Sequence, residues 1–229
     1  QLSLLELQQT LDWRGRDSRI VRGAFEWSHS KKQLLARFKN HFLRKPAPRE
    51  KDRLHVLFWL PGGMGDVACA KRLVSAYRSY LPEAVFDIYS PLPGVARLLF
   101  GRDKNTCICE GKPFAPASYD LAVLACMAAV FLAADEGRLG QLAPDFLPVL
   151  ERARAAQEAL GSLLDDLFLT DGLLGRWLAH HGGRRFDLLA YTGGVELPHD
   201  TPERIKVPGG GLEKFGLTDV PYITFHDLS

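Results

Sequence analysis

The sequence predicts an α/β protein built on a Rossmann-like parallel sheet with a helical insertion. Two observations lead to this prediction. From residue 53 onward, short apolar segments alternate with helical ones, as in the β-α-β units of a parallel sheet. A glycine-rich turn that ends in an aspartate, Gly62–Asp66, separates the first strand from the first helix. Ligands of doubly wound domains bind at the carboxyl ends of the strands, where such a turn lies.

Residues 1–50 are expected to form a basic helical extension. Apolar residues recur at helical spacing between positions 34 and 43, and the prolines of Pro46–Pro48 mark a boundary before the sheet. Basic residues outnumber acidic ones between positions 14 and 53. This extension can face anionic lipid or a phosphorylated acceptor, or it can pack on its own domain with its charges in solvent.

The alternating region predicts strands and helices in a fixed order. The expected strands are short, apolar and rich in leucine or β-branched residues, as in strands buried on both faces: residues 54–60, 85–89, 106–109 and 121–126. The helices expected between the first three strands span residues 67–80 and 95–100.

The stretch from residue 127 to residue 182 departs from this alternation. Its content of alanine, leucine, glutamate and arginine predicts helices, as an insertion or a lid over the crevice, at residues 127–134, 145–160 and 163–181. Two further strands are expected after it, at residues 186–191 and 204–207. A last strand, residues 222–226, is expected to open a second α/β domain.

The composition excludes several classes of protein. A formal net charge of +2 over 229 residues is too small to indicate a nucleic-acid partner. No apolar run is long enough to span a membrane and no signal-peptide pattern is visible, which predicts a cytoplasmic protein.

The four cysteines are Cys69, Cys107, Cys109 and Cys126. They lie in apolar stretches and form no C-x-x-C pair, which predicts reduced, buried thiols. Cys107 and Cys109 alternate as in a strand, so both are expected to face the same side of the sheet. No metal site is expected, because further ligands at a suitable spacing are not apparent.

Three interpretations of the glycine turn compete. As a dinucleotide fingerprint of an NAD(P)-dependent oxidoreductase, it requires an acid at the end of the second strand, but that strand contains Asp87 in its interior and ends in Tyr89 and Ser90. As a purely structural turn, it uses Asp66 to cap the helix, and the protein is then a non-catalytic binding or assembly module. The third interpretation rests on a resemblance to a known family.

The segment from Val56 to Val67, with the helix that ends near Tyr80-Leu81-Pro82 and the following strand, resembles the opening of the family 9 glycosyltransferases, the bacterial heptosyltransferases. Tyr119–Leu124 is similar to a later strand of that family, and Pro221–His226 to the first strand of its second domain. The resemblance covers roughly residues 53–229 and is strongest at 54–90. The helices at 127–182 and the basic extension depart from the family pattern, which suggests a divergent member.

The resemblance implies the N-terminal half of a GT-B fold: an acceptor-binding domain at residues 51–219, and the start of a donor-binding domain at 220–229. It implies an inverting, metal-independent transfer of a heptose-like sugar from a nucleotide-sugar, with no other cofactor. The acceptor would be a glycan, a lipopolysaccharide or a protein, and the enzyme would be cytoplasmic or peripheral to the inner membrane.

The family's general base maps onto Asp66. The residues expected to contact the acceptor are Gly62, Gly63, Met64, Gly65, Lys71, Arg72, Gly193 and Gly194. Lys71 and Arg72 follow Asp66 on the same helix, where they can meet acceptor phosphates or simply face solvent.

Overall fold

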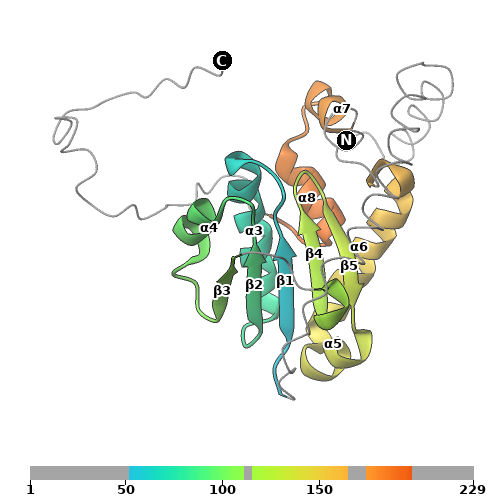
Figure 1. Cartoon of the computed structure of the whole chain (residues 1–229). Coiled ribbons are helices and arrows are strands. Elements are labelled where there is room, and N and C mark those ends of the chain that lie inside the picture. Colours follow the sequence, from blue (N-terminus) through green and yellow to red (C-terminus); the bar gives the residue numbers. More distant parts are fainter. Residues whose placement is uncertain (1–51, 111–114, 165–173, 198–229) are drawn as a thin grey trace, which may run out of the picture.

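A five-stranded sheet with the strand order β3-β2-β1-β4-β5 forms the centre of the molecule (Figure 1). The strands are β1 (His55–Trp59), β2 (Val85–Tyr89), β3 (Thr106–Cys109), β4 (Leu121–Ala125) and β5 (Ala129–Ala134). The first four run parallel, and β5 is antiparallel to β4. The structure is a computed structural model that describes residues 52–110, 115–164 and 174–197. The Rossmann-like α/β sheet and its four parallel strands are thereby confirmed.

Two helices make the crossovers between the first three strands. Helix α3 (Met64–Tyr80) connects β1 to β2, and α4 (Pro93–Phe100) connects β2 to β3. Both begin two or three residues earlier than the sequence predicts. The other helices of the described residues follow β5: α5 (Glu136–Leu142), α6 (Leu147–Leu160), α7 (Arg176–His180) and α8 (Arg185–Gly193). Short 3-10 turns occupy Pro116–Ser118, Pro144–Phe146 and Gly161–Leu164.

The main core lies between the helices and one face of the sheet. Val56 and Phe58 of β1 are fully buried in it, and the Phe58 ring meets the Tyr77 ring of α3 edge-on at 5.5 Å between centroids. Buried residues of α4, α5, α6 and α8 join the same cluster. Helices α3 and α8 accordingly lie behind the sheet in Figure 1. The opposite face carries only a small cluster of buried residues within the described chain: Leu57, Tyr119 and Ala122.

Residues 127–134, expected as a helix, instead form a short turn and strand β5. The Cys126 amide donates to the Ala128 carbonyl oxygen at 3.2 Å, which turns the chain back along β4. Strand β5 then pairs with β4 along its length: Ala129 lies opposite Ala125, and Ala134 lies opposite Leu121. The alanine content favoured a helix, but pairing with a buried strand outweighs a weak local propensity.

Residues 186–191, expected as a strand, instead belong to helix α8. Asp187 in its first turn accepts a hydrogen bond from the Arg184 amide at 2.6 Å. The helix ends at Gly193 and is capped by Gly194, which has a left-handed backbone with φ of +67°. A short apolar run does not distinguish a strand from a buried helix by periodicity alone.

Several predictions lie outside the described residues. They concern the extension at 1–50, the strand at 204–207 and the start of a second domain at 220–229. The expected helix at 163–181 is described only in part, as a 3-10 turn that ends at Leu164 and as α7. Among the described helices, none combines the length and apolarity needed to cross a membrane.

Candidate functional site

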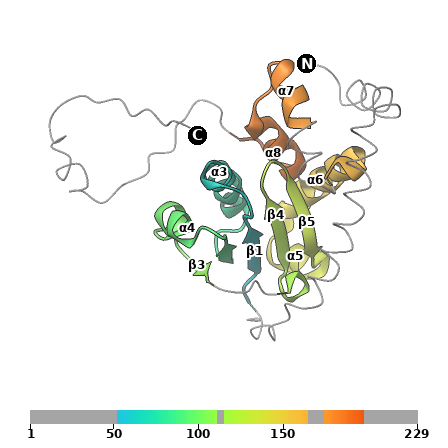
Figure 2. The same ribbon diagram turned by 45° about the horizontal axis from the view of Figure 1, so that its top comes forward.

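The glycine turn lies at the edge of the sheet where the parallel strands end. Strand β1 pairs with β2 on one side and with β4 on the other. The chain leaves β1 toward β2 and later crosses to β4, so the strand order reverses between β1 and β4. Ligand crevices of open α/β sheets form at such a reversal. Figure 2 turns this edge, with the start of α3, toward the viewer.

Asp66 lies in the first turn of α3 rather than before the helix. The helix begins at Met64 with Gly63 as its N-cap residue, and the Asp66 carboxylate folds back so that Oδ2 accepts a hydrogen bond from the Gly63 amide at 2.8 Å. The carboxylate thus satisfies one of the backbone N–H groups that a helix start leaves unbonded. Asp66 does cap the helix, but from its third position and not as the N-cap residue that the sequence predicts.

Gly62 makes room for this carboxylate. A Cβ atom at Gly62 would lie 2.4 Å from both Cβ and Oδ2 of Asp66, far closer than two such atoms approach. At Gly65 an added Cβ would meet no atom within 4 Å, and Met64 between them is 63% exposed. Gly62 is therefore needed for packing, whereas the rest of the turn presents an open backbone surface.

The end of β2 lacks the acid that a dinucleotide-binding site needs. Asp87 lies inside the strand, where its Oδ2 accepts a hydrogen bond from the Tyr119 hydroxyl at 2.9 Å. Ser90 follows the strand, is buried, and accepts a hydrogen bond from the Leu92 amide at 3.1 Å. A ribose hydroxyl would find no carboxylate on the residues that end this strand, which argues against the oxidoreductase interpretation.

Lys71 and Arg72 both contact neighbouring helices or loops. The Lys71 ammonium forms an ion pair with Asp103 at 2.5 Å and lies 5.0 Å from the centroid of the Phe100 ring. The Arg72 guanidinium lies over the Phe186 ring at 4.2 Å. Lys71 therefore faces α4 and the loop after it, whereas Arg72 faces α8.

Gly193 and Gly194 end helix α8 and are buried. The Gly193 carbonyl accepts a hydrogen bond from the Tyr77 hydroxyl at 2.8 Å, and a Cβ there would lie 2.6 Å from Leu73 Cδ1. A Cβ at Gly194 would lie 2.2 Å from the Val149 carbonyl oxygen. Both glycines let α8 pack closely against α3 and α6, away from the glycine turn at the start of α3.

A groove of about 1180 Å³ runs between α3, α6 and α8. Its polar lining includes Arg72, Tyr80, Arg152, Tyr191 and Glu196. Arg72 follows Asp66 by six residues, a rise of about 9 Å along the helix, so the groove begins well away from the turn. The sequence did not reveal Arg152 or Tyr191 as lining residues, because the groove depends on α8, whose residues were expected to form a strand.

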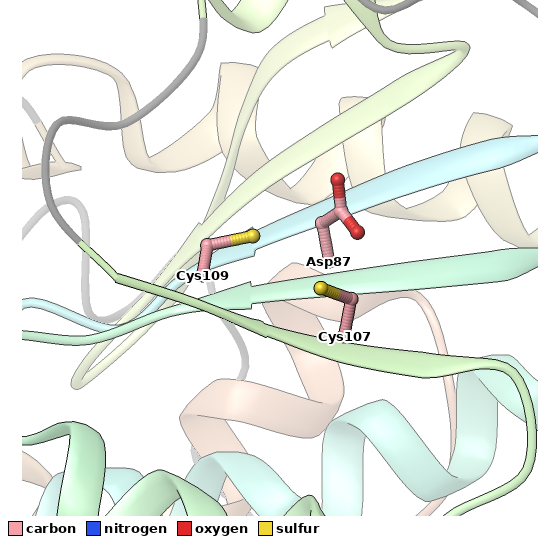
Figure 3. A group of neighbouring side chains, drawn as sticks. All are labelled: Asp87, Cys107 and Cys109. Atoms are coloured by element: carbon pink, nitrogen blue, oxygen red, sulfur yellow. The ribbon is translucent and has the colours of Figure 1, made fainter.

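A second group of polar side chains, which could act as metal ligands, lies on the other face of the sheet. Asp87, Cys107 and Cys109 bring their oxygen and sulfur atoms within 4.8 Å of one another (Figure 3). Burial raises the pKa of the Asp87 carboxyl, and burial together with the Asp87 charge raises the pKa of Cys109 to about 12. The two cysteines do face the same side, as expected.

The prediction that all four thiols are buried is wrong for Cys107, which is exposed, and holds in full only for Cys126. All four cysteines are free thiols, as expected. Strand β3 is at the edge of the described sheet, and the side chains of Cys107 and Cys109 point to the face that the described helices leave uncovered. The apolar sequence of this strand therefore does not ensure that its thiols are buried. The sequence does not show that β2 pairs with β3, so it could not predict that Asp87 lies beside the two cysteines.

No protein-family model matches the chain, and no curated protein or solved structure matches it significantly. The resemblance to the family 9 glycosyltransferases therefore stays a prediction from the residues that carry it. The function has to be proposed from the glycine turn and its position in the sheet.

Proposed function

We propose that this chain is the acceptor-binding half of an inverting, metal-independent glycosyltransferase of the GT-B type, with Asp66 as its general base. The donor is a nucleotide-sugar with a heptose-like sugar, bound mainly by a second domain that begins near residue 220. The acceptor is a glycan, a lipopolysaccharide or a protein. The supporting observations are the Rossmann-like sheet and the glycine turn beside its strand-order reversal.

The observation that carries this proposal is the fixed carboxylate of Asp66 at the carboxyl end of β1. The Gly63 amide donates a hydrogen bond to Oδ2 and so holds the carboxylate at the start of α3. An acceptor hydroxyl is a weak nucleophile until its proton leaves as the new bond forms. A positioned carboxylate that takes this proton typically accelerates such a step by ~10²–10⁴-fold.

The turn also leaves space for an acceptor. Gly63 and Gly65 carry no side chain, and a Cβ at Gly63 would meet no atom closer than 3.8 Å. A sugar hydroxyl can therefore approach the backbone between β1 and α3 closely. In the proposed displacement, the acceptor oxygen bonds to the anomeric carbon as Asp66 takes its proton. The nucleoside diphosphate leaves with the electron pair of the broken bond, and the configuration at carbon inverts.

A binding screen separates this proposal from its rivals. Nucleotide-sugars and NAD(P)H are each added to the full-length protein, and the melting temperature and the heat of binding are measured. We expect a nucleotide-sugar to bind and to raise the melting temperature, because a ligand that binds only the folded state stabilises it. Binding of NAD(P)H alone would favour an oxidoreductase. If neither ligand class binds, the protein is better described as a binding or assembly module.

A further inference from the structure

The sheet face that the described helices leave uncovered holds a cluster that the proposed transfer does not use. Cys107 and Cys109 lie two residues apart on β3, so their side chains project to the same face. Asp87 of β2 pairs directly with Cys107 in the parallel register. Figure 3 shows the two thiols and the carboxylate gathered where the neighbouring strands meet.

We propose that Asp87, Cys107 and Cys109 bind a zinc ion that ties the edge strand β3 to β2. Zn²⁺ prefers sulfur, nitrogen and carboxylate oxygen ligands in a tetrahedral arrangement. With a Zn–S bond of ~2.3 Å, neighbouring ligand atoms of such a site lie about 3.5–3.8 Å apart. The ligand atoms here already lie within 4.8 Å of one another. Small rotations of the side chains therefore suffice to close the site, and water takes the fourth position.

The carboxylate of the cluster is already oriented by a neighbour. Tyr119 is 5% exposed and packs with Leu57 and Ala122, and its hydroxyl donates to Oδ2 of Asp87 at 2.9 Å. Carboxylates that bind metals are commonly held by such an outer hydrogen bond, whose loss typically lowers metal affinity by ~10–100-fold. The hydrogen bond from Tyr119 thus fixes the Asp87 carboxylate beside the two thiols, which supports a binding site more strongly than proximity alone.

The ion can reach the cluster from solvent. Cys107 is exposed, and β3 has a neighbouring strand on only one side within the described sheet. Thiolate ligands favour zinc over the hard cations magnesium and calcium, which prefer oxygen. The site lies on the sheet face opposite α3, so the transfer proposed at Asp66 does not involve the metal.

A competition titration tests the site. The reduced full-length chain is titrated with Zn²⁺ against a chromogenic chelator, and Co²⁺ is added separately to record thiolate-to-metal absorption. We expect one equivalent to bind. Cys107→Ser and Cys109→Ser should each weaken binding by more than the ~10–100-fold expected for an outer partner. Cys69→Ser, outside the cluster, serves as the matched control. Zn²⁺ affinity equal to wild type in both cluster variants, or no binding by the wild type, would overturn the proposal.

Two further measurements do not depend on how well the cysteine variants fold. In the wild-type chain, Zn²⁺ should slow alkylation of Cys107 and Cys109 but leave Cys69 unaffected. Tyr119→Phe should lower Zn²⁺ affinity by ~10–100-fold. Tyr89→Phe, which removes a hydroxyl from the same face of β2, should leave the affinity unchanged. Alkylation rates that Zn²⁺ does not alter would exclude the site, and equal effects of the two tyrosine variants would exclude the positioning role of Tyr119.

Discussion

Gly62 and Asp66 form one unit at the residue scale. The carboxylate of Asp66 reaches the Gly63 amide only because Gly62 has no side chain in its path. The glycine content of the turn thus has two separate causes. Gly62 is required by the packing of Asp66, whereas Gly63 and Gly65 are free of close neighbours and leave the backbone accessible.

Substitution of two glycines separates these causes. We expect Gly62→Ala to lower the free energy of unfolding by about 1–3 kcal/mol, because the new methyl group displaces the Asp66 side chain. Gly65→Ala, inside α3 and in open space, should instead raise it by up to about 1 kcal/mol, since alanine favours the helix. Urea denaturation of both variants measures the two effects. A Gly62→Ala variant as stable as Gly65→Ala would contradict this account of the turn.

Asp120 connects several segments at the scale of the elements. It is fully buried at the start of β4, where Oδ2 accepts from the His55 amide and Oδ1 from Arg138 Nε, both at 2.8 Å. Arg138 of α5 also donates to the Arg53 carbonyl oxygen at 2.9 Å. One carboxylate therefore holds β1, β4 and α5 together at the end of the strands opposite the glycine turn.

Loss of this carboxylate should be costly. We expect Asp120→Ala to reduce the free energy of unfolding by ~3 kcal/mol, because Arg138 and the His55 amide would lose a buried partner. The matched control is Glu110→Ala, which removes an ion pair between exposed side chains, Arg97 and Glu110, and should cost no more than ~1 kcal/mol. Equal losses in chemical denaturation would show that Asp120 does not bridge these elements.

Helix α8 depends on the glycine that ends it. Gly194 has a positive φ and its Cα faces the Val149 carbonyl of α6, so Gly194→Ala adds both a backbone strain of ~1–2 kcal/mol and a steric clash. Gly182→Ala also lies at a positive φ, but in open space, and should cost only the strain. Thermal melting of the two variants should show the larger loss for Gly194→Ala. The reverse order would mean that α8 is seated differently on α6.

At the scale of the whole molecule, the sequence predicted the central strands well. Strands β1 to β4 are short apolar runs bounded by turn residues, and the pattern sufficed to find them. Strand β5 and helix α8 were assigned the wrong type. Each is a short apolar segment whose state is decided by what it packs against: β5 pairs with β4, the strand just before it, and α8 packs on α6, which is distant in sequence.

The candidate sites divide in the same way. The glycine turn is contiguous in sequence, and Gly62–Asp66 could be found directly. The cluster of Asp87, Cys107 and Cys109 requires knowledge that β2 pairs with β3 and in which register. The groove beside Arg72 requires the placement of α8. The local sequence pattern therefore predicted the glycine turn, which one segment forms. The cysteine cluster and the groove arise only when separate segments pack together.

The most direct test of the central claim compares sugar transfer by the full-length wild type and by Asp66→Asn. Asparagine retains an oxygen that can accept the hydrogen bond from the Gly63 amide, but it cannot take a proton from the acceptor. Equal melting temperatures would establish that the helix cap is intact in the variant. We predict that kcat for transfer from the nucleotide-sugar then falls by ~10²–10⁴-fold. A kcat equal to that of the wild type would contradict the role of Asp66 as general base.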